Sequence, residues 1–467
     1  MPLPLEGVRA CAPRKNKNTL ARRPGVLRAL GAALLTAALS GWAAAQTAPQ
    51  ITPPAHALTL QSALDAAQAR SYALVAQDAA ARSARELAVA AERLPDPMLR
   101  LSVDNLPVDG PMRFSLTDDF MTMRSVGLTQ TFTRADKRRA RAARFEREAD
   151  SAQAARAMQL AELRRGTALA WFDRYYQQQM VALLSKQRDE AALQIEAADA
   201  AYRTGRGAQA DVFMARSGVA RIEDRIRAAQ AREANATTTL ARWVGELAAA
   251  PLGEPPPIWT TRLAAHRLEH ELARHPDIAL MASKEAVALA AAEVARQDKR
   301  VDWTASLMYS QRGEAFSNMV SIAVSVPLQW DQKNRQDREL AARLAKAEQA
   351  RAEREEMTRA HLAETERWLA TWRSDLARLA DYDATLVPLA AERTRAALAA
   401  YRGGGGDLSA VLEARRMEID TRIERLRIEM ETAGLWVELE YLIPAEGETE
   451  SAAAPQPSMT NAPEPQR

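Results

Sequence analysis

The sequence predicts a mainly α-helical protein with a smaller β-component, built from two tandem copies of one unit. Three observations support this fold class. The 467-residue chain is dominated by Ala, Leu, Glu, Arg and Gln and has only 5% aromatic residues, a composition typical of long helices packed through small side chains. One motif occurs twice, and each copy separates two helical patterns. Four short segments instead alternate apolar and polar residues with a period of two, as strands do.

The repeated motif marks two turns. Residues 201–216 read AYRTGRGAQADVFMAR, and residues 400–415 read AYRGGGGDLSAVLEAR, without a gap between the copies when they are aligned. Because each copy lies where one long helical pattern stops and another starts, we expect each to form the turn of a helical hairpin. A repeat of about 200 residues is too long for a solenoid unit, so the pattern indicates a duplicated half-protein.

The N-terminal residues 1–45 have the pattern of a secretory signal peptide. An apolar segment at 29–39 follows a basic region and precedes Ala43-Ala44-Ala45, a small-residue cleavage site. This apolar run is too short to span a bilayer stably, so we expect cleavage after residue 45. An uncleaved anchor is the alternative. The basic region contains Arg14, Lys15, Lys17, Arg22, Arg23 and Arg28, and Arg9 precedes it.

Removal of this segment changes the charge and the cysteine content. The segment holds seven of the 63 basic and one of the 60 acidic residues, so the formal charge changes from +3 to −3. No basic block remains that would suggest nucleic-acid binding. Cys11, the only cysteine, lies in the same segment, so we expect no disulfide, no thiol chemistry and no N-terminal lipid attachment. No later stretch of about 18 apolar residues predicts a transmembrane helix.

The first unit is expected over residues 58–249, after a Pro-containing lead at 46–57. Hydrophobic periodicity places its elements, and Pro and Gly place their ends. They are a helix at 58–93, strands at 99–104 and 125–132, a long helix at 135–202 and a returning helix at 208–247.

The second unit, expected over residues 263–444, repeats this order after a Pro-rich linker at 250–262. Its elements are a helix at 268–299, strands at 303–310 and 320–328, a long helix at 331–401 and a last helix that ends near Leu442. The tail at 445–467 is rich in Ser, Ala, Pro, Glu and Gln and is expected to be disordered.

The helix lengths predict coiled-coil hairpins. The long helix of the first unit would extend roughly 100 Å at 1.5 Å per residue. The two shorter helices of that unit, stacked end to end, would match it in length. A hairpin that long must be a coiled coil, because no globular core is so deep.

The four strands predict an oligomer if their apolar faces contact lipid. Each strand has about the length that a tilted membrane strand needs. A membrane barrel must close, and the smallest have about eight strands, so one chain cannot form one. Three chains would supply twelve strands. A small soluble sheet that caps a helical bundle is the alternative. Aromatic residues near the strands, which could form interface girdles, are Phe114, Phe120, Phe132, Trp303, Tyr309, Phe316 and Trp330.

This order of elements, given twice, resembles the TolC-like outer-membrane efflux family. The turn Tyr-Arg-x-Gly-x-Gly followed by Val-x-x-Ala-Arg is similar to the family's hairpin tip in both copies. The runs VGLTQ at 126–130 and VSVPL at 324–328 resemble its strand signatures. The resemblance covers about residues 58–442.

The resemblance implies a homotrimeric exit duct that needs no cofactor. A twelve-stranded barrel would cross the lipid of the outer membrane, and a twelve-helix barrel would extend into the periplasm. The hairpin tips would dock on a periplasmic adaptor (membrane fusion) protein coupled to an inner-membrane efflux pump. The loop FSLTDDFMTMR at 114–124, with LPDPM at 94–98, looks like the branch that exports heavy metals, either copper and silver or cobalt, zinc and cadmium. Lipidated members carry a Cys at the mature N-terminus, which this chain does not.

Eight residues at the two turns are the candidate adaptor-docking residues. Glycine permits positive φ and close backbone approach, and an exposed arginine can pair with an acidic partner. The alternative is that the glycines only form the turn and the arginines are solvated. The eight are Tyr202, Arg203, Gly205, Gly207, Tyr401, Arg402, Gly404 and Gly406.

Asp211 and Glu413, just past each turn, are candidate aperture carboxylates. In a symmetric trimer each would occur three times around the axis, and a ring of carboxylates can select cations. An ordinary exposed helix face is the alternative. Met121 and Met123 are candidates for transient contact with soft metal ions, although Met is also a common gap filler.

No arrangement for catalysis is present. The sequence has no Ser/His/Asp, Cys/His, phosphate-loop or HExxH pattern, and the glycine run at 403–406 lacks the strand and the Lys-Ser/Thr of a phosphate loop. We therefore expect a protein that is not an enzyme and binds no metal permanently.

Three functions remain open. The first is an exit duct that exports heavy-metal cations, and the second is a duct of the same fold for drugs or proteins. The third is a periplasmic coiled-coil scaffold or adaptor without a pore.

Overall fold

The computed structural model describes residues 57–263 and 268–443. The expected signal peptide, the lead up to residue 56 and the C-terminal tail lie outside these ranges. Within them the chain is mainly helical and contains one four-stranded sheet, which confirms the expected α-helical fold with a small β-component.

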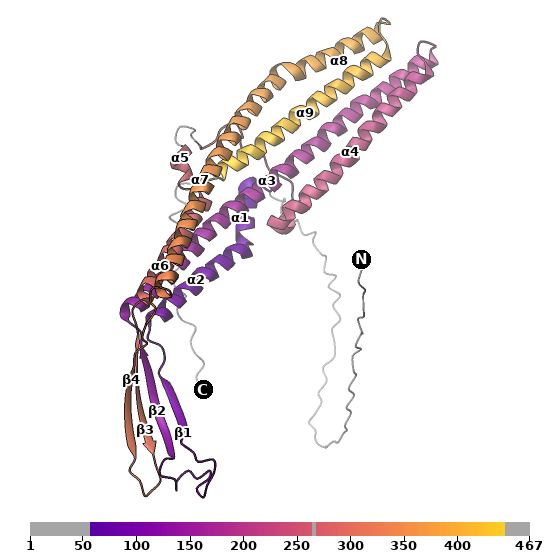
Figure 1. The fold of residues 1–467 in the computed structure, drawn as a ribbon. Helices are drawn as coiled ribbons and strands as arrows, with labels where there is room; N and C mark the ends of the chain where they lie inside the picture. The colour runs from indigo at the N-terminus through magenta and orange to yellow at the C-terminus, as the bar shows by residue number, and fades with distance from the viewer. Residues whose placement is uncertain (1–56, 264–267, 444–467) are drawn as a thin grey trace, which may run out of the picture. The chain divides into compact units, whose positions relative to one another are not determined.

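The first unit contains the expected strand pair and long hairpin (Figure 1). Its longest helix has 69 residues, roughly 100 Å. In chain order the elements are α1 (Leu60–Ala69), α2 (Tyr72–Glu92), β1 (Met98–Asp104), β2 (Met123–Phe132), α3 (Ala135–Arg203), α4 (Gln209–Val244) and the 3₁₀ helix η1 (Gly245–Ala249).

The second unit repeats the order with more interruptions. Its elements are α5 (Leu268–Leu272), α6 (Pro276–Asp298), β3 (Trp303–Gln311), β4 (Met319–Ser325), α7 (Gln336–Asp381), the π-helical turn η3 (Tyr382–Leu386), α8 (Val387–Arg402) and α9 (Leu408–Glu440).

Four expected elements were wrong in detail. The helix predicted at 58–93 is two helices, because the Ser71 hydroxyl accepts a hydrogen bond from the Leu74 amide and starts α2 anew. The helix predicted at 268–299 is also two, because Pro276 takes the first position of α6 and ends continuity with α5. The helix predicted from residue 331 begins only at Gln336 and contains η3. β4 ends at Ser325, two residues before Pro327, which cannot donate to a strand ladder.

The helices pack as the length comparison predicts. α3 contacts α1, α2 and α4 along its length, and it also contacts α6 and α9 of the second unit. The largest apolar cluster lies where α3, α4, α7 and α9 meet the segment that joins the units. There the indole N–H of Trp171 donates to the Leu58 carbonyl at 3.0 Å, and that of Trp372 donates to the Ile258 carbonyl at 3.2 Å. One tryptophan of each long helical segment thus holds the segment that leads into a unit.

The four strands form one antiparallel sheet in the order β1-β2-β3-β4. Figure 1 shows it at the opposite end of α3 from the turn into α4. Within the described ranges, no strand pairs with the outer edge of β1 or of β4. In residues 57–263 and 268–443 no helix is both long and apolar enough to cross a membrane.

Candidate functional site

The two hairpin turns have the same backbone construction. In the first turn the Arg206 and Gly207 amides donate to the Ala201 carbonyl at 2.9 and 3.1 Å. In the second, the Gly405 amide donates to the Ala400 carbonyl at 3.0 Å. The sequence repeat is therefore also a repeat of local structure.

Two glycines in each turn have different tasks. Gly205 and Gly404 have φ values of 70° and 77°, a left-handed conformation that costs other residues about 1–2 kcal/mol. Gly207 and Gly406 instead permit close approach, because a Cβ at either position would lie 3.1 Å from the Cβ of Ala201 or Ala400. The geometry of the turns is therefore enough to explain why glycine occupies these positions, and no contact with a partner protein is required.

The side chains at the turns differ in how they are held. Arg203 forms an ion pair with Asp199 at 2.6 Å, yet 76% of its side-chain surface is exposed. Arg402 is exposed and has no hydrogen bond or ion pair with any residue that the structure describes. Tyr202 is exposed, whereas Tyr401 is half-buried against an apolar cluster.

That cluster joins the two turns into one tip. It is formed by buried residues of α3, α4 and α9, with partly buried residues of α8 packed against them, so the docking candidates of both hairpins lie close together. Its buried members are Ala198, Val212, Ala215, Leu408 and Val411.

The two candidate aperture carboxylates lie in different surroundings. The carboxylate of Asp211 accepts a hydrogen bond from the Ala208 amide at 3.0 Å, which satisfies a free N–H at the start of α4. Glu413 is exposed on α9 and has no polar partner among the described residues. Asp211 therefore has a structural role at the start of α4, whereas Glu413 has none among the described residues.

The two candidate methionines lie at the loop end of the sheet. Met121 is exposed in the loop before β2, and its amide donates to the Asp119 carboxylate at 2.8 Å. Met123 begins β2 opposite Asp104. Among residues 57–263 and 268–443, no group of three or more His, Cys, Asp or Glu side chains is arranged to hold a metal ion.

The sheet has one apolar face and one polar face. The register places apolar residues side by side across all four strands, and they are exposed, Ile322 to 77%. At the helix end of this face the rings of Phe132 and Trp303 stack 4.1 Å apart. Two cross-strand rows show the pattern: Leu101, Val126, Tyr309 and Val320, and then Leu99, Leu128, Leu307 and Ile322.

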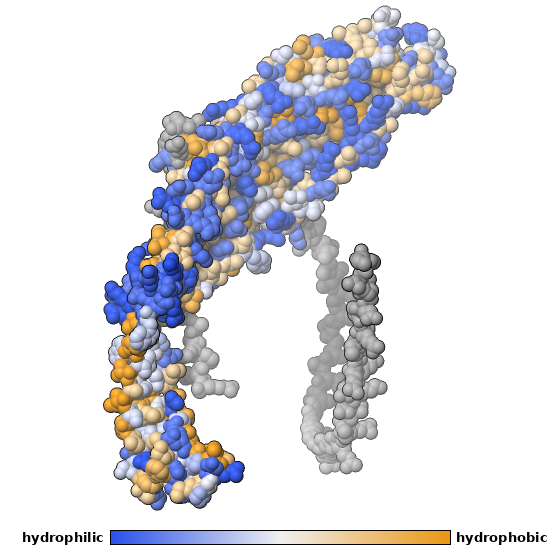
Figure 2. Space-filling model, viewed as in Figure 1, coloured by the Kyte–Doolittle hydropathy of each residue, from blue (hydrophilic) through white to orange (hydrophobic). Residues whose placement is uncertain are grey.

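The opposite face is polar and internally hydrogen-bonded. The Ser102 and Ser125 hydroxyls donate to the Asp104 carboxylate at 3.0 and 2.9 Å. The Ser125 and Ser310 hydroxyls lie 2.9 Å apart. Sequence reasoning identified the strands but not this network, although the serines and Asp104 occupy the polar positions of the same alternation. Figure 2 shows hydrophobic side chains over the sheet and a strongly hydrophilic region where the helices begin.

One titratable cluster lies among the helices, away from both turns. The rings of His275 and His361 lie 4.2 Å apart, and His361 Nε2 lies 3.0 Å from the Asp277 carboxylate. Burial, together with the neighbouring His361, lowers the pKa of His275 to about 4. Burial also raises the pKa of Glu438, although Arg165 lies 3.1 Å away.

Comparison with known proteins identifies the fold. The sequence matches no protein-family model and no curated protein sequence. The structure is similar to that of the outer-membrane channel OprN, with 18% identity, a TM-score of 0.69 and coverage of 82% of this chain and 90% of that one. It is similar to CusC, a transmembrane channel, with 15% identity, a TM-score of 0.70 and coverage of 83% and 92%. It is also similar to the outer membrane protein VceC of Vibrio cholerae, with 18% identity, a TM-score of 0.67 and coverage of 81% and 94%. The chain thus has the fold of outer-membrane channel proteins over most of its length.

Proposed function

We propose that three copies of this chain form the outer-membrane exit channel of a tripartite efflux system. The sheet carries this proposal, because its apolar face is exposed and its two outer edges have no partner strand in the described part of the chain. Exposed apolar surface and open strand edges are both unfavourable in water. Lipid would cover the exposed apolar face, and a strand of the next copy would pair with each open edge.

The number of strands favours closure by copies of the chain. With four antiparallel strands per copy, β4 of one copy lies antiparallel to β1 of the next, so the up-and-down pattern continues around a ring. Three copies give twelve strands, an even number in the range of bacterial membrane barrels. The polar face with Asp104, Ser125 and Ser310 then lines the lumen. The fold shared with OprN, CusC and VceC supports the same assembly.

A pair of adjacent substitutions tests the membrane assignment. Ile322→Lys places a charge on the apolar face, and Ser321→Lys, one residue away and also exposed, places it on the polar face. A lysine that faces the centre of a bilayer costs about 2–4 kcal/mol, and one in an aqueous lumen costs little. We expect Ile322→Lys to deplete the protein from isolated outer membranes and Ser321→Lys to leave it there.

The scaffold alternative predicts a different result. In a soluble periplasmic scaffold both lysines would be solvated, and the wild-type chain would leave with the periplasmic fraction. Equal recovery of the two variants in that fraction would therefore refute the channel.

We further propose that the tip docks on a periplasmic adaptor coupled to an inner-membrane pump, and that the cargo is a heavy-metal cation. Support for docking comes from the exposed guanidinium groups of Arg203 and Arg402 at one shared tip. Support for the cargo comes from the loop sequence at 114–124 and from Met123, Met308 and Met319 at polar-face positions of the sheet. A duct for drugs or proteins is the alternative.

Growth of a deletion strain tests both points. We expect sensitivity to one or two of copper, silver, zinc, cobalt and cadmium, with unchanged tolerance of dyes and antibiotics. The double variant Arg203→Asp/Arg402→Asp should fail to restore tolerance while its trimer remains in the membrane, because reversed charges repel an acidic adaptor surface. Drug sensitivity in the deletion strain would refute the metal cargo, and full complementation by the double variant would refute the docking role.

A further inference from the structure

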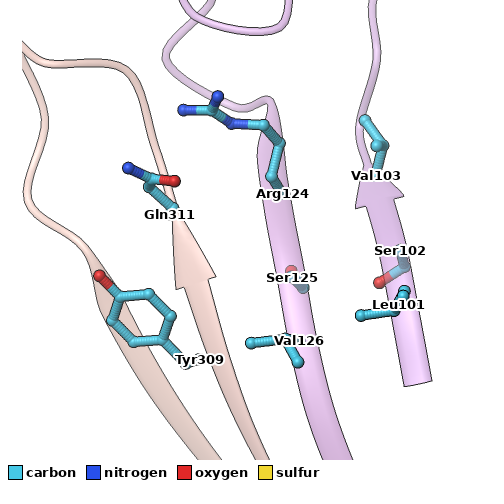
Figure 3. Close-up of a pocket in the computed structure, with 8 residues that line it drawn as sticks. All are labelled: Leu101, Ser102, Val103, Arg124, Ser125, Val126, Tyr309 and Gln311. Atoms are coloured by element: carbon cyan, nitrogen blue, oxygen red, sulfur yellow. The ribbon is translucent and has the colours of Figure 1, made fainter. Parts of the chain in front are cut away.

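A pocket of about 390 Å³ lies on the sheet near the loops that precede β2 and follow β3. It is open to one side and spans β1, β2 and β3. Figure 3 shows its lining, with the guanidinium group of Arg124 extending toward Gln311. The residues that line it from the apolar face are Leu101, Val103, Arg124, Val126, Tyr309 and Gln311.

Most of the lining belongs to the same side as the apolar surface, and only Ser102 and Ser125 come from polar-face positions. Arg124 pairs with Val103 on β1 and with Gln311 on β3, which forms the last row before the loops. The next row toward the helices contains Leu101, Val126 and Tyr309. The pocket therefore has two polar side chains at its loop end and an apolar floor below them.

The charge of Arg124 is not compensated on this side of the sheet. The side chain is half-buried, its Nε is buried without a hydrogen-bond partner, and it forms no ion pair with a described residue. The nearest carboxylate along the neighbouring strand, Asp104, points to the other face, where Ser102 and Ser125 bind it. A partly buried arginine without a partner among the described residues is able to pair with an anion from outside the chain.

The position of Arg124 matches the edge of a membrane. Eight residues separate it from Phe132, whose stacked pair with Trp303 marks the helix end of the apolar face. At about 3.4 Å per residue that separation is about 27 Å along the strand, or about 21 Å across the bilayer at a tilt of about 40°, close to the roughly 25 Å apolar band of membrane barrels. Arg124 then lies at the level of lipid headgroups, on the side away from the helices.

We propose that this pocket binds a phosphate-bearing lipid of the leaflet that faces away from the helices. The guanidinium group of Arg124 and the side-chain amide of Gln311 donate to the headgroup phosphate, and one acyl chain lies over Leu101, Val126 and Tyr309. Arginine suits this role because its planar fork donates two parallel hydrogen bonds to a phosphate. The inference rests on the membrane location proposed above. The apolar floor favours a lipid over a free anion, which would leave that floor exposed to water.

Lipid retention by the purified trimer tests the site. The trimer in a neutral detergent is incubated with phosphatidylglycerol, with phosphatidylcholine or with inorganic phosphate, and bound molecules are counted by native mass spectrometry. We expect phosphatidylglycerol to be retained in preference to phosphatidylcholine and not to be displaced by phosphate. Arg124→Gln should weaken this retention roughly five- to tenfold.

Arg100→Gln is the matched control, because Arg100 lies on the neighbouring strand but at a polar-face position opposite Gly127. It should leave retention unchanged. Val103→Glu, at an exposed position in the same row as Arg124, should weaken retention as Arg124→Gln does, by repelling the phosphate, and it gives a second measurement should Arg124→Gln fail to assemble.

Three results would each overturn the lipid site. They are equal retention by the wild type and both pocket variants, an equal loss of retention in Arg100→Gln, and displacement of the lipid by inorganic phosphate. In those cases the trimer and its membrane insertion remain intact. A wild-type chain that neither assembles nor inserts would instead refute the proposed channel, and the lipid site with it.

Discussion

Each of the two tips contains two glycines with different backbone roles. Gly205 and Gly404 have positive φ, and Gly207 and Gly406 permit close backbone approach. Both roles follow from the sequence alone, since they depend on neighbours within a few residues. The ion pair of Arg203 with Asp199 is also local, at a spacing of four on one helix. The residue four positions before Arg402 is Leu398, which carries no charge, so Arg402 has no equivalent ion pair and its charge is left free.

At the residue scale, His275 predicts a loss of stability in acid. Its pKa is near 4 in the folded protein and near 6.5 when unfolded, so the unfolded chain binds more protons between these values. The stability contribution is therefore complete above about pH 6.5 and is lost as the pH falls toward 4. The difference corresponds to at most about 3 kcal/mol. Hydrogen exchange at the start of α6, measured from pH 7 to pH 4.5, should show this loss.

The variant His275→Asn separates titration from capping. His275 Nδ1 accepts a hydrogen bond from the Asp277 amide at 3.1 Å, and Asn can cap a helix in the same way without titrating. We expect His275→Asn to flatten the pH dependence. His270→Asn, at an exposed position in α5, should not change it. An unaltered slope in His275→Asn would assign the acid sensitivity to another group.

At the scale of elements, the sequence predicted which segments are helical better than where they are interrupted. The hydrophobic pattern was sufficient to predict α3 as one uninterrupted helix, because this segment has no proline and a single glycine, Gly166. That glycine is where the ring of Trp243 packs most closely, since a Cβ there would lie 2.6 Å from the ring. The break at Ser71 depends on whether one hydroxyl caps a helix or is solvated, and periodicity does not distinguish these states. The π-helical turn η3 before Pro388 was also not predicted, because it leaves the helical periodicity of the sequence almost continuous.

Contacts between the two hairpins could not be predicted, because they join residues about 200 positions apart. Arg415 of α9 forms an ion pair with Glu190 of α3 at 2.6 Å and also contacts Glu418 at 3.2 Å. Glu418, only 4% exposed, lies 2.9 Å from Arg422 as well. Arg225 of α4 reaches Asp420 of α9 at 2.8 Å, but both side chains are nearly half exposed.

These two ion-pair sites predict unequal effects of the same chemical change. Glu418→Gln removes a buried charge between two arginines and should destabilise the protein by about 2–3 kcal/mol. Asp420→Asn removes an exposed charge from the same helix and should cost less than about 1 kcal/mol. Denaturant unfolding of the detergent-solubilised protein, followed by circular dichroism, measures both. Similar decreases in the free energy of unfolding of the two variants would show that burial does not determine the strength of these ion pairs.

At the scale of the whole molecule, the proposed assembly depends on two strand edges that the chain itself cannot join. β1 and β4 lie at opposite edges of the sheet, separated by β2 and β3. At about 4.8 Å per strand spacing their separation is roughly 14 Å, far beyond the roughly 4 Å between the Cβ atoms of a disulfide. A disulfide between β1 and β4 must therefore join two copies. The only native cysteine, Cys11, lies in the expected signal peptide, so it should not compete.

Cysteine pairs across these edges predict a closed ring of three. We combine Leu101→Cys in turn with Val320→Cys, Ile322→Cys or Val324→Cys, whose side chains all lie on the apolar face. We expect at least one combination to cross-link, because the stagger between β4 of one copy and β1 of the next decides which residue lies opposite Leu101. Denaturing electrophoresis should then show covalent dimers and trimers, with the trimer as the end point. Leu101→Cys with Ser321→Cys should not cross-link, because Ser321 faces the other side. Covalent products larger than a trimer would contradict a closed ring of three. The absence of cross-linking in every combination would show that the edges of β1 and β4 do not meet.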